Sequence, residues 1–67
     1  MDGLLENGTP VEVKSSETLR GEHLRGLERF LDRHGSEEGI LIYRGKEFKS
    51  GKIKAINLNR MLMYGLN

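Results

Sequence analysis

Glu12 and Lys14 flank a valine within a short apolar segment of this chain. In an extended strand alternate side chains share a face, so these two charges point to one side while Val11 and Val13 point to the other. Partly buried charges persist when they are paired or when they bind a metal ion. Asp2 lies ten residues before Glu12, so two carboxylates could hold Mg²⁺ or Mn²⁺. Lys14 would then steer a water molecule or stabilise a phosphoryl transition state, and the chemistry predicted is metal-assisted attack on a phosphoryl group.

A β-hairpin must bring these residues together. We expect strands at residues 3–6 and 10–14, because Asn7 and Gly8 between them accept the positive φ angles of a tight turn. Pro10 lacks a backbone donor and is expected at the start of the second strand.

The register of this hairpin decides whether the metal site can form. A two-residue turn would place Asp2 opposite Val13, on the face away from Glu12 and Lys14. A three-residue loop would place Asp2 opposite Lys14, with all three polar groups on one side. Asn-Gly favours the shorter turn in isolation, whereas the metal site requires the longer loop.

An amphipathic helix is expected at residues 19–34, with Gly35 as its C-cap. Gly21 and Gly26 either allow close approach of this helix to a sheet, or Gly21 marks a later start. One of three polar side chains should cap its first turn, namely Ser15, Ser16 or Thr18. The buried stripe consists of the apolar residues at helical spacing, Leu19, Leu24, Leu27, Phe30 and Leu31.

Three further elements complete an α/β or α+β domain that occupies residues 1–67. Residues 39–43 form an apolar run typical of a central strand covered on both faces. A polar turn region follows, then a last strand at 52–57 and a short helix at 58–64 that Asn57 caps. The expected order is strand, strand, helix, strand, strand, short helix.

Composition excludes several classes of protein. The 67 residues include no cysteine, so neither a disulfide scaffold nor a zinc finger fits. No apolar run approaches the roughly 20 residues that span a bilayer, and we expect a cytoplasmic protein without membrane contact. His23 and His34 stand eleven residues apart, too far to hold one metal ion together, and we interpret both as structural or exposed.

Charge is distributed unevenly along the chain. Residues 1–43 hold five Lys and Arg against nine acids, a net charge of −4, and residues 44–67 hold six against one, a net charge of +5. Lysines of the second part either meet nucleic-acid phosphates or guard a sheet edge against aggregation. They are Lys46, Lys49, Lys52 and Lys54. Met61, Met63 and Tyr64 near the end suit either a partner surface or core packing.

Asp2, followed by Glu12-Val13-Lys14 and an amphipathic helix, resembles the core of the PD-(D/E)XK nuclease superfamily. The resemblance implies a minimal restriction-endonuclease-like fold, with Asp2 and Glu12 as ligands of Mg²⁺ or Mn²⁺ and Glu12 and Lys14 as catalytic residues. The segments Pro10–Ser16 and Gly39–Tyr43 are similar to the uncharacterised C-terminal domain of archaeal and bacterial AAA-type ATPases.

This sequence differs from the superfamily pattern in two ways. The superfamily core begins with a helix and a strand that have no counterpart before Asp2, so the resemblance implies a core truncated at its N-terminus. No P-loop signature is present, so ATP hydrolysis by this chain is not expected.

Two functions stay open at this point. In the first, the chain is a non-catalytic accessory domain with an internal Glu12–Lys14 pair, acting by association with itself, with an ATPase or with DNA. In the second, it is an active metal-dependent nuclease.

Overall fold

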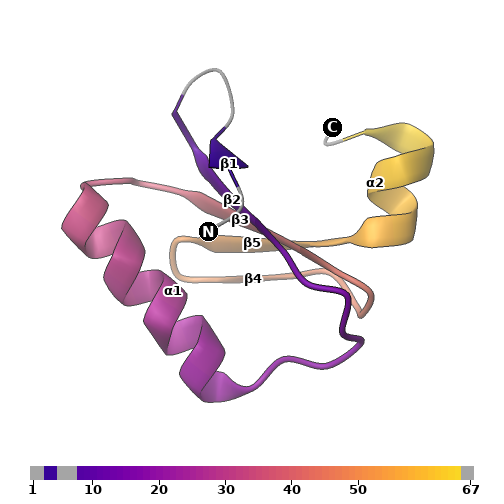
Figure 1. The fold of residues 1–67 in the computed structure, drawn as a ribbon, viewed down its shortest axis with the longest axis horizontal. Helices are drawn as coiled ribbons and strands as arrows, with labels where there is room; N and C mark the ends of the chain where they lie inside the picture. The colour runs from indigo at the N-terminus through magenta and orange to yellow at the C-terminus, as the bar shows by residue number, and fades with distance from the viewer. Residues whose placement is uncertain (1–2, 5–7, 66–67) are drawn as a thin grey trace.

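A mixed β-sheet forms the middle of the molecule, with a helix packed on each face (Figure 1). The computed structural model describes residues 3–4 and 8–65. The elements in chain order are β1 (Gly3–Leu4), β2 (Pro10–Val13), α1 (Gly21–His34), β3 (Gly39–Tyr43), β4 (Phe48–Ser50), β5 (Ile53–Asn57) and α2 (Leu58–Tyr64). The expected mixture of helix and sheet is confirmed.

The sheet has the strand order β1-β2-β3-β5-β4. Strands β2, β3 and β5 run parallel in its centre, and β1 and β4 pair antiparallel at its two edges. The apolar run at 39–43 is the central strand, as predicted, and all five of its residues are buried. Alternation along β3 sends Leu41 toward α1, and it sends Ile40 and Ile42 toward the opposite face.

Each face of the sheet has its own apolar core. On the α1 side, the buried residues are Leu27, Leu31, Leu41 and Ile53. On the other side, Ile40, Ile42 and Ile56 are buried, and Leu58 and Met61 of α2 pack against them. Met61 therefore serves core packing, one of the two uses expected for it.

Helix α1 begins at Gly21, two residues later than its apolar stripe predicted, which confirms the alternative that Gly21 marks a later start. None of the expected serine or threonine caps is used, because Arg20 occupies the N-cap position and makes no side-chain cap hydrogen bond. The Ser16 hydroxyl instead closes a local turn, where it accepts from Thr18 N (3.1 Å) and donates to Thr18 O (2.7 Å). Gly35 is the C-cap as predicted, with φ 72°.

Strand β4 was not predicted, because its residues were interpreted as a polar turn region. It pairs antiparallel with β5 through a tight turn at Gly51, where φ is 56°. Only Phe48 of its three residues is partly buried, while the other two are exposed. A short edge strand of this kind carries almost no apolar pattern for a sequence reading to detect.

The hairpin register differs from both registers considered for it. Gly3 pairs with Val11 and Leu4 with Pro10, a register shifted by one residue from the first alternative and by two from the second. Pro10 does begin β2, as its missing donor predicted. Asp2 lies outside the described residues.

We expect Gly39→Ala to destabilise the protein by about 1–3 kcal/mol. A Cβ atom at Gly39 would lie 2.7 Å from Leu31 Cδ2 and 2.8 Å from Cδ1, and Leu31 is fully buried. Urea unfolding measures the loss. Gly26→Ala is the matched control: a Cβ there meets nothing within 4 Å, so the gain in helix propensity should stabilise the protein by up to about 1 kcal/mol. Equal effects of the two changes would contradict the packing described.

Candidate functional site

Glu12 points from β2 toward α1 and is bound by a histidine of that helix. Its Oε2 lies 2.9 Å from His23 Nε2, and the two side chains are 17% and 32% exposed. Because a carboxylate only accepts hydrogen bonds, His23 Nε2 is the donor. Glu12 therefore has a hydrogen-bond partner across the interface between β2 and α1.

Lys14 follows β2 on the same side of the sheet. Its backbone N–H donates to Ile42 O (2.8 Å), which continues the parallel pairing with β3 for one more residue. Its half-buried side chain lines a pocket, and within the described part of the chain no group forms an ion pair or hydrogen bond with its ammonium. The internal pair expected between Glu12 and Lys14 is thus replaced by the pair between Glu12 and His23.

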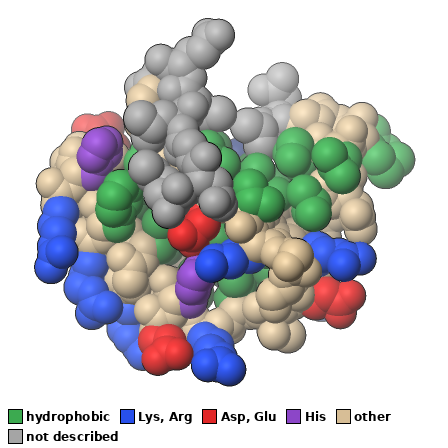
Figure 2. Space-filling view, viewed as in Figure 1, with side chains coloured by type: hydrophobic (Ala, Val, Ile, Leu, Met, Phe, Trp, Pro, Cys, Tyr) green, Lys and Arg blue, Asp and Glu red, His purple; other side chains and the backbone are tan. Residues whose placement is uncertain are grey.

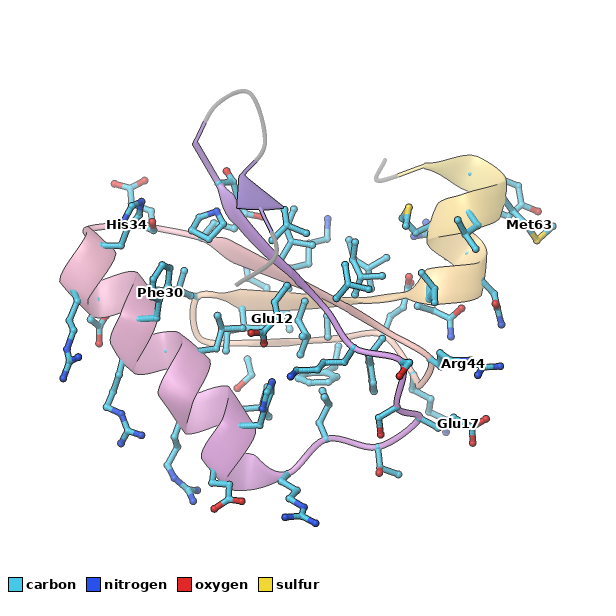
Figure 3. All side chains as sticks on the ribbon, viewed as in Figure 1. Glu12, Glu17, Phe30, His34, Arg44 and Met63 are labelled. Carbon is cyan, nitrogen blue, oxygen red and sulfur yellow. The ribbon has the colours of Figure 1, made fainter. Side chains whose placement is uncertain are left out.

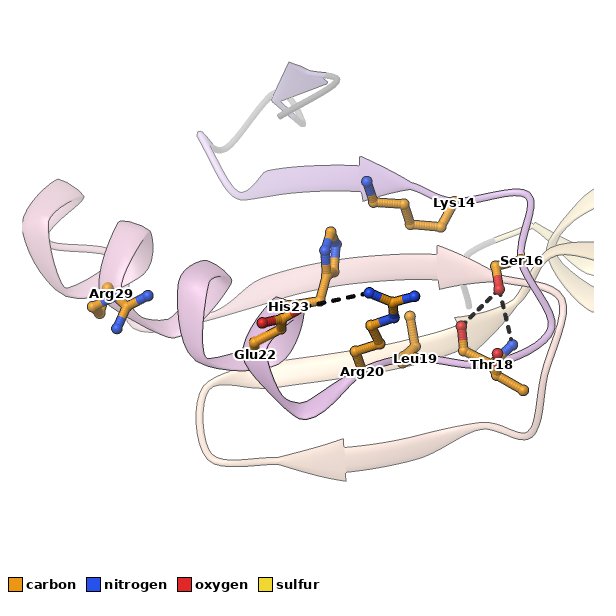
Figure 4. Close-up of a pocket in the computed structure, with 8 residues that line it drawn as sticks. All are labelled: Lys14, Ser16, Thr18, Leu19, Arg20, Glu22, His23 and Arg29. Carbon is orange, nitrogen blue, oxygen red and sulfur yellow. Dashed lines mark hydrogen bonds and ion pairs between the residues drawn. The ribbon is translucent and has the colours of Figure 1, made fainter.

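Two adjoining pockets flank His23. The larger, here called the cationic pocket, has a volume of 510 Å³ and is lined by Lys14, Ser16, Arg20, Glu22, His23 and Arg29 among others (Figure 4). The smaller, here called the apolar slot, has a volume of 290 Å³ and is lined by Glu12, Glu22, His23, Gly26, Leu27 and Phe30. Glu22 and His23 belong to both and separate one from the other.

Of the three residues of the expected metal site, the structure describes two. Glu12 and Lys14 lie on one side of the sheet, as alternation predicted, while Asp2 is outside the described residues. Residues 3–4 and 8–65 contain no group of three His, Asp or Glu side chains arranged to hold a metal ion.

His23 is the site residue that the sequence reading missed. It was interpreted as structural, without a link to Glu12. The signal available was its position on the edge of the apolar stripe of α1, four residues before the buried Leu27. A polar residue at a core-facing edge needs a polar partner, but only the packing of α1 against β2 identifies which one.

The four lysines of the C-terminal part do not extend this site. Lys49 and Lys54 pair across β4 and β5, and Lys54 also lies opposite Ile40, which places both on the face away from Glu12. Lys52 Nζ lies 2.7 Å from Asp32 Oδ1 of α1. Lys46 is exposed after β3, where its backbone carbonyl accepts a hydrogen bond from the Tyr43 hydroxyl.

Helix α2 exposes apolar side chains at the other end of the molecule. Asn57 caps it by accepting from Arg60 N (3.1 Å), as predicted. Leu62, Met63 and Tyr64 are 71%, 72% and 69% exposed, and Met63 points away from the sheet (Figure 3). This group of three residues is called the α2 apolar patch. Of the described helices, none is long and apolar enough to cross a membrane.

Comparison with known protein families, with curated proteins and with solved structures gives no significant match for this chain. Its function is therefore inferred from the geometry described above.

Proposed function

We propose that the chain is a nuclease-like accessory domain that acts by association and does not cleave phosphodiester bonds. The observation that carries the proposal is the hydrogen bond of 2.9 Å between His23 Nε2 and Glu12 Oε2. A metal ion would have to compete with His23 for that carboxylate oxygen, and the vacated imidazole would lose its partner in a half-buried position.

The arrangement of strands around Glu12 supports the kinship with PD-(D/E)XK nucleases. The strand with the Glu-x-Lys sequence pairs antiparallel with the strand before it and parallel with the strand after the helix. The order β1-β2-α1-β3 is what the resemblance implies for the middle of that core. We propose the kinship on this arrangement of strands.

The α2 apolar patch supports association as the mode of action. Three consecutive large apolar residues of α2, a helix without a buried residue, are each about 70% exposed. Clustered exposure of this kind marks contact surfaces in small proteins. A second copy of the chain is the occupant we propose, because its own α2 presents the same exposed apolar side chains, as a symmetric contact requires.

A second candidate function is metal-dependent cleavage with Asp2 and Glu12 as ligands and Lys14 as the catalytic base or charge stabiliser. The specific observation in its favour is that Glu12 and Lys14 lie on one face and line two pockets that adjoin at His23.

A double-mutant cycle tests whether the contact between Glu12 and His23 serves stability. We expect Glu12→Ala and His23→Ala to be coupled by about 1 kcal/mol in urea unfolding, because each change leaves the other partner without its hydrogen bond. The matched control pairs Glu12→Ala with Arg33→Ala, where Arg33 is exposed on the same helix. Additive effects in the first cycle would contradict a structural role for the pair.

Mn²⁺ distinguishes the two candidate functions. In the accessory domain, Mn²⁺ should broaden the NMR signals of Glu12 no more than those of the exposed Glu37 and Glu38. DNA and RNA incubated with the protein and Mn²⁺ should stay intact, as they do with Glu12→Gln. Selective broadening at Glu12, together with cleavage that Glu12→Gln abolishes, would overturn the proposal in favour of the nuclease.

Sedimentation equilibrium tests the proposed association. We expect the average mass to rise with concentration for the unchanged chain, and to stay at that of the monomer for Leu62→Lys with Met63→Lys. Arg44→Glu is the control, because Arg44 is equally open to solvent but lies outside the α2 apolar patch. A monomer at every concentration, or loss of association in the control alone, would refute self-association through α2.

A further inference from the structure

The cationic pocket carries more positive charge than it can neutralise by itself. Lys14, Arg20 and Arg29 line it, against Glu22 as its carboxylate. Arg20 and Glu22 stand 3.7 Å apart with side chains 86% and 71% exposed, so water screens most of their attraction. The formal net charge of these four groups is +3 − 1 = +2. It is similar in magnitude to the charge of about −1.5 to −2 that a phosphate monoester carries near pH 7.

The donors of this pocket come from elements that the fold holds in place. The backbone of Lys14 is tied to β3, Arg20 is the residue that enters α1, and His23 of the first turn lies between them in Figure 4. Arg29 lines the same pocket from farther along α1, and Figure 4 shows it apart from Lys14 and Arg20. The Lys14 ammonium and the Arg20 guanidinium line the space beside His23, and groups of this kind suit a phosphate group.

The apolar slot next to it has a different chemistry. Leu27 is buried and Phe30 is half-buried, and together they give the slot an apolar wall. Gly26 leaves room above the helix, since a Cβ atom there would meet nothing within 4 Å. The carboxylates of Glu12 and Glu22 repel a phosphate but accept hydrogen bonds from amino groups, so the slot suits a flat base that carries an amino group.

We propose that the two pockets together bind a nucleoside 5′-monophosphate, with its phosphate in the cationic pocket and its base in the apolar slot. Glu22 and His23, which line both, then lie beside the sugar. The proposal depends neither on kinship with nucleases nor on association through α2. The same chemical group occurs free and at the 5′ end of a nucleic-acid strand.

Titration calorimetry with AMP, inorganic phosphate and adenosine tests whether the cationic pocket binds the phosphate. We expect AMP to bind more tightly than either fragment. Lys14→Gln and Arg20→Gln should each weaken AMP and inorganic phosphate by about tenfold, the loss expected for one charge-assisted hydrogen bond. Arg33→Gln is the matched control, because it removes the same charge from α1 at an exposed position that lines neither pocket.

A larger side chain in the apolar slot tests whether the base binds there. Gly26→Leu should weaken AMP by about tenfold, to the affinity of inorganic phosphate, and should leave inorganic phosphate unchanged. Leucine is a better helix former than glycine, so α1 is preserved, and Gly26→Ala gives a milder version of the same block. A 5′-phosphorylated trinucleotide of adenine, titrated in parallel, identifies whether the free nucleotide or the strand end is the preferred source.

Three results would overturn the inference. One is AMP binding no tighter than inorganic phosphate. Another is an Arg33→Gln effect as large as that of Arg20→Gln, since binding would then reflect the general charge of the helix. The third is a Gly26→Leu variant that binds AMP as the unchanged chain does.

Discussion

The burial of β3 on both faces is the constraint on which the rest of this structure depends. All residues of Gly39–Tyr43 are buried, and the strand pairs with a parallel neighbour on each side. Neither face of such a strand can be left in water, so each must be covered by a separate layer. Helix α1 covers Leu41, and Gly39 allows it to come close enough for Leu31 to pack on the sheet. Helix α2 covers part of the other face through Leu58 and Met61.

The same constraint explains why Glu12 needs a partner. Glu12 lies beside Leu41 across the pair β2 and β3, so its side chain emerges next to the apolar core under α1. A carboxylate in that place loses much of its hydration, and the loss must be offset by hydrogen bonds. His23 in the first turn of α1 supplies one at 2.9 Å. Figure 2 shows acidic, basic and histidine side chains close together on this part of the surface.

Features set by local chemistry were the ones that the sequence predicted. Gly35 ends α1 because it accepts φ 72°, and Asn57 begins α2 because its side chain accepts from Arg60 N. The central strand was readable from an unbroken apolar run. Features that depend on distant neighbours were not. Strand β4 forms because it pairs with β5, a neighbour that the apolar pattern of β4 does not indicate. The N-cap of α1 was predicted wrongly because the Ser16 hydroxyl bonds to the backbone of Thr18 within its own turn.

The Glu-x-Lys spacing predicted a shared face correctly and a contact wrongly, and strand geometry explains both outcomes. Residues two apart on a strand stand about 6.5 Å from one another, since each residue rises about 3.3 Å. Their side chains share a direction but do not meet unless they lean together. Glu12 leans to His23, and Lys14 lines the pocket beside Ser16 and Arg20. Glu12 is bound to His23, whereas no group within residues 3–4 and 8–65 bonds to the Lys14 ammonium. The positive charge of Lys14 therefore adds to that of the two arginines that line the cationic pocket.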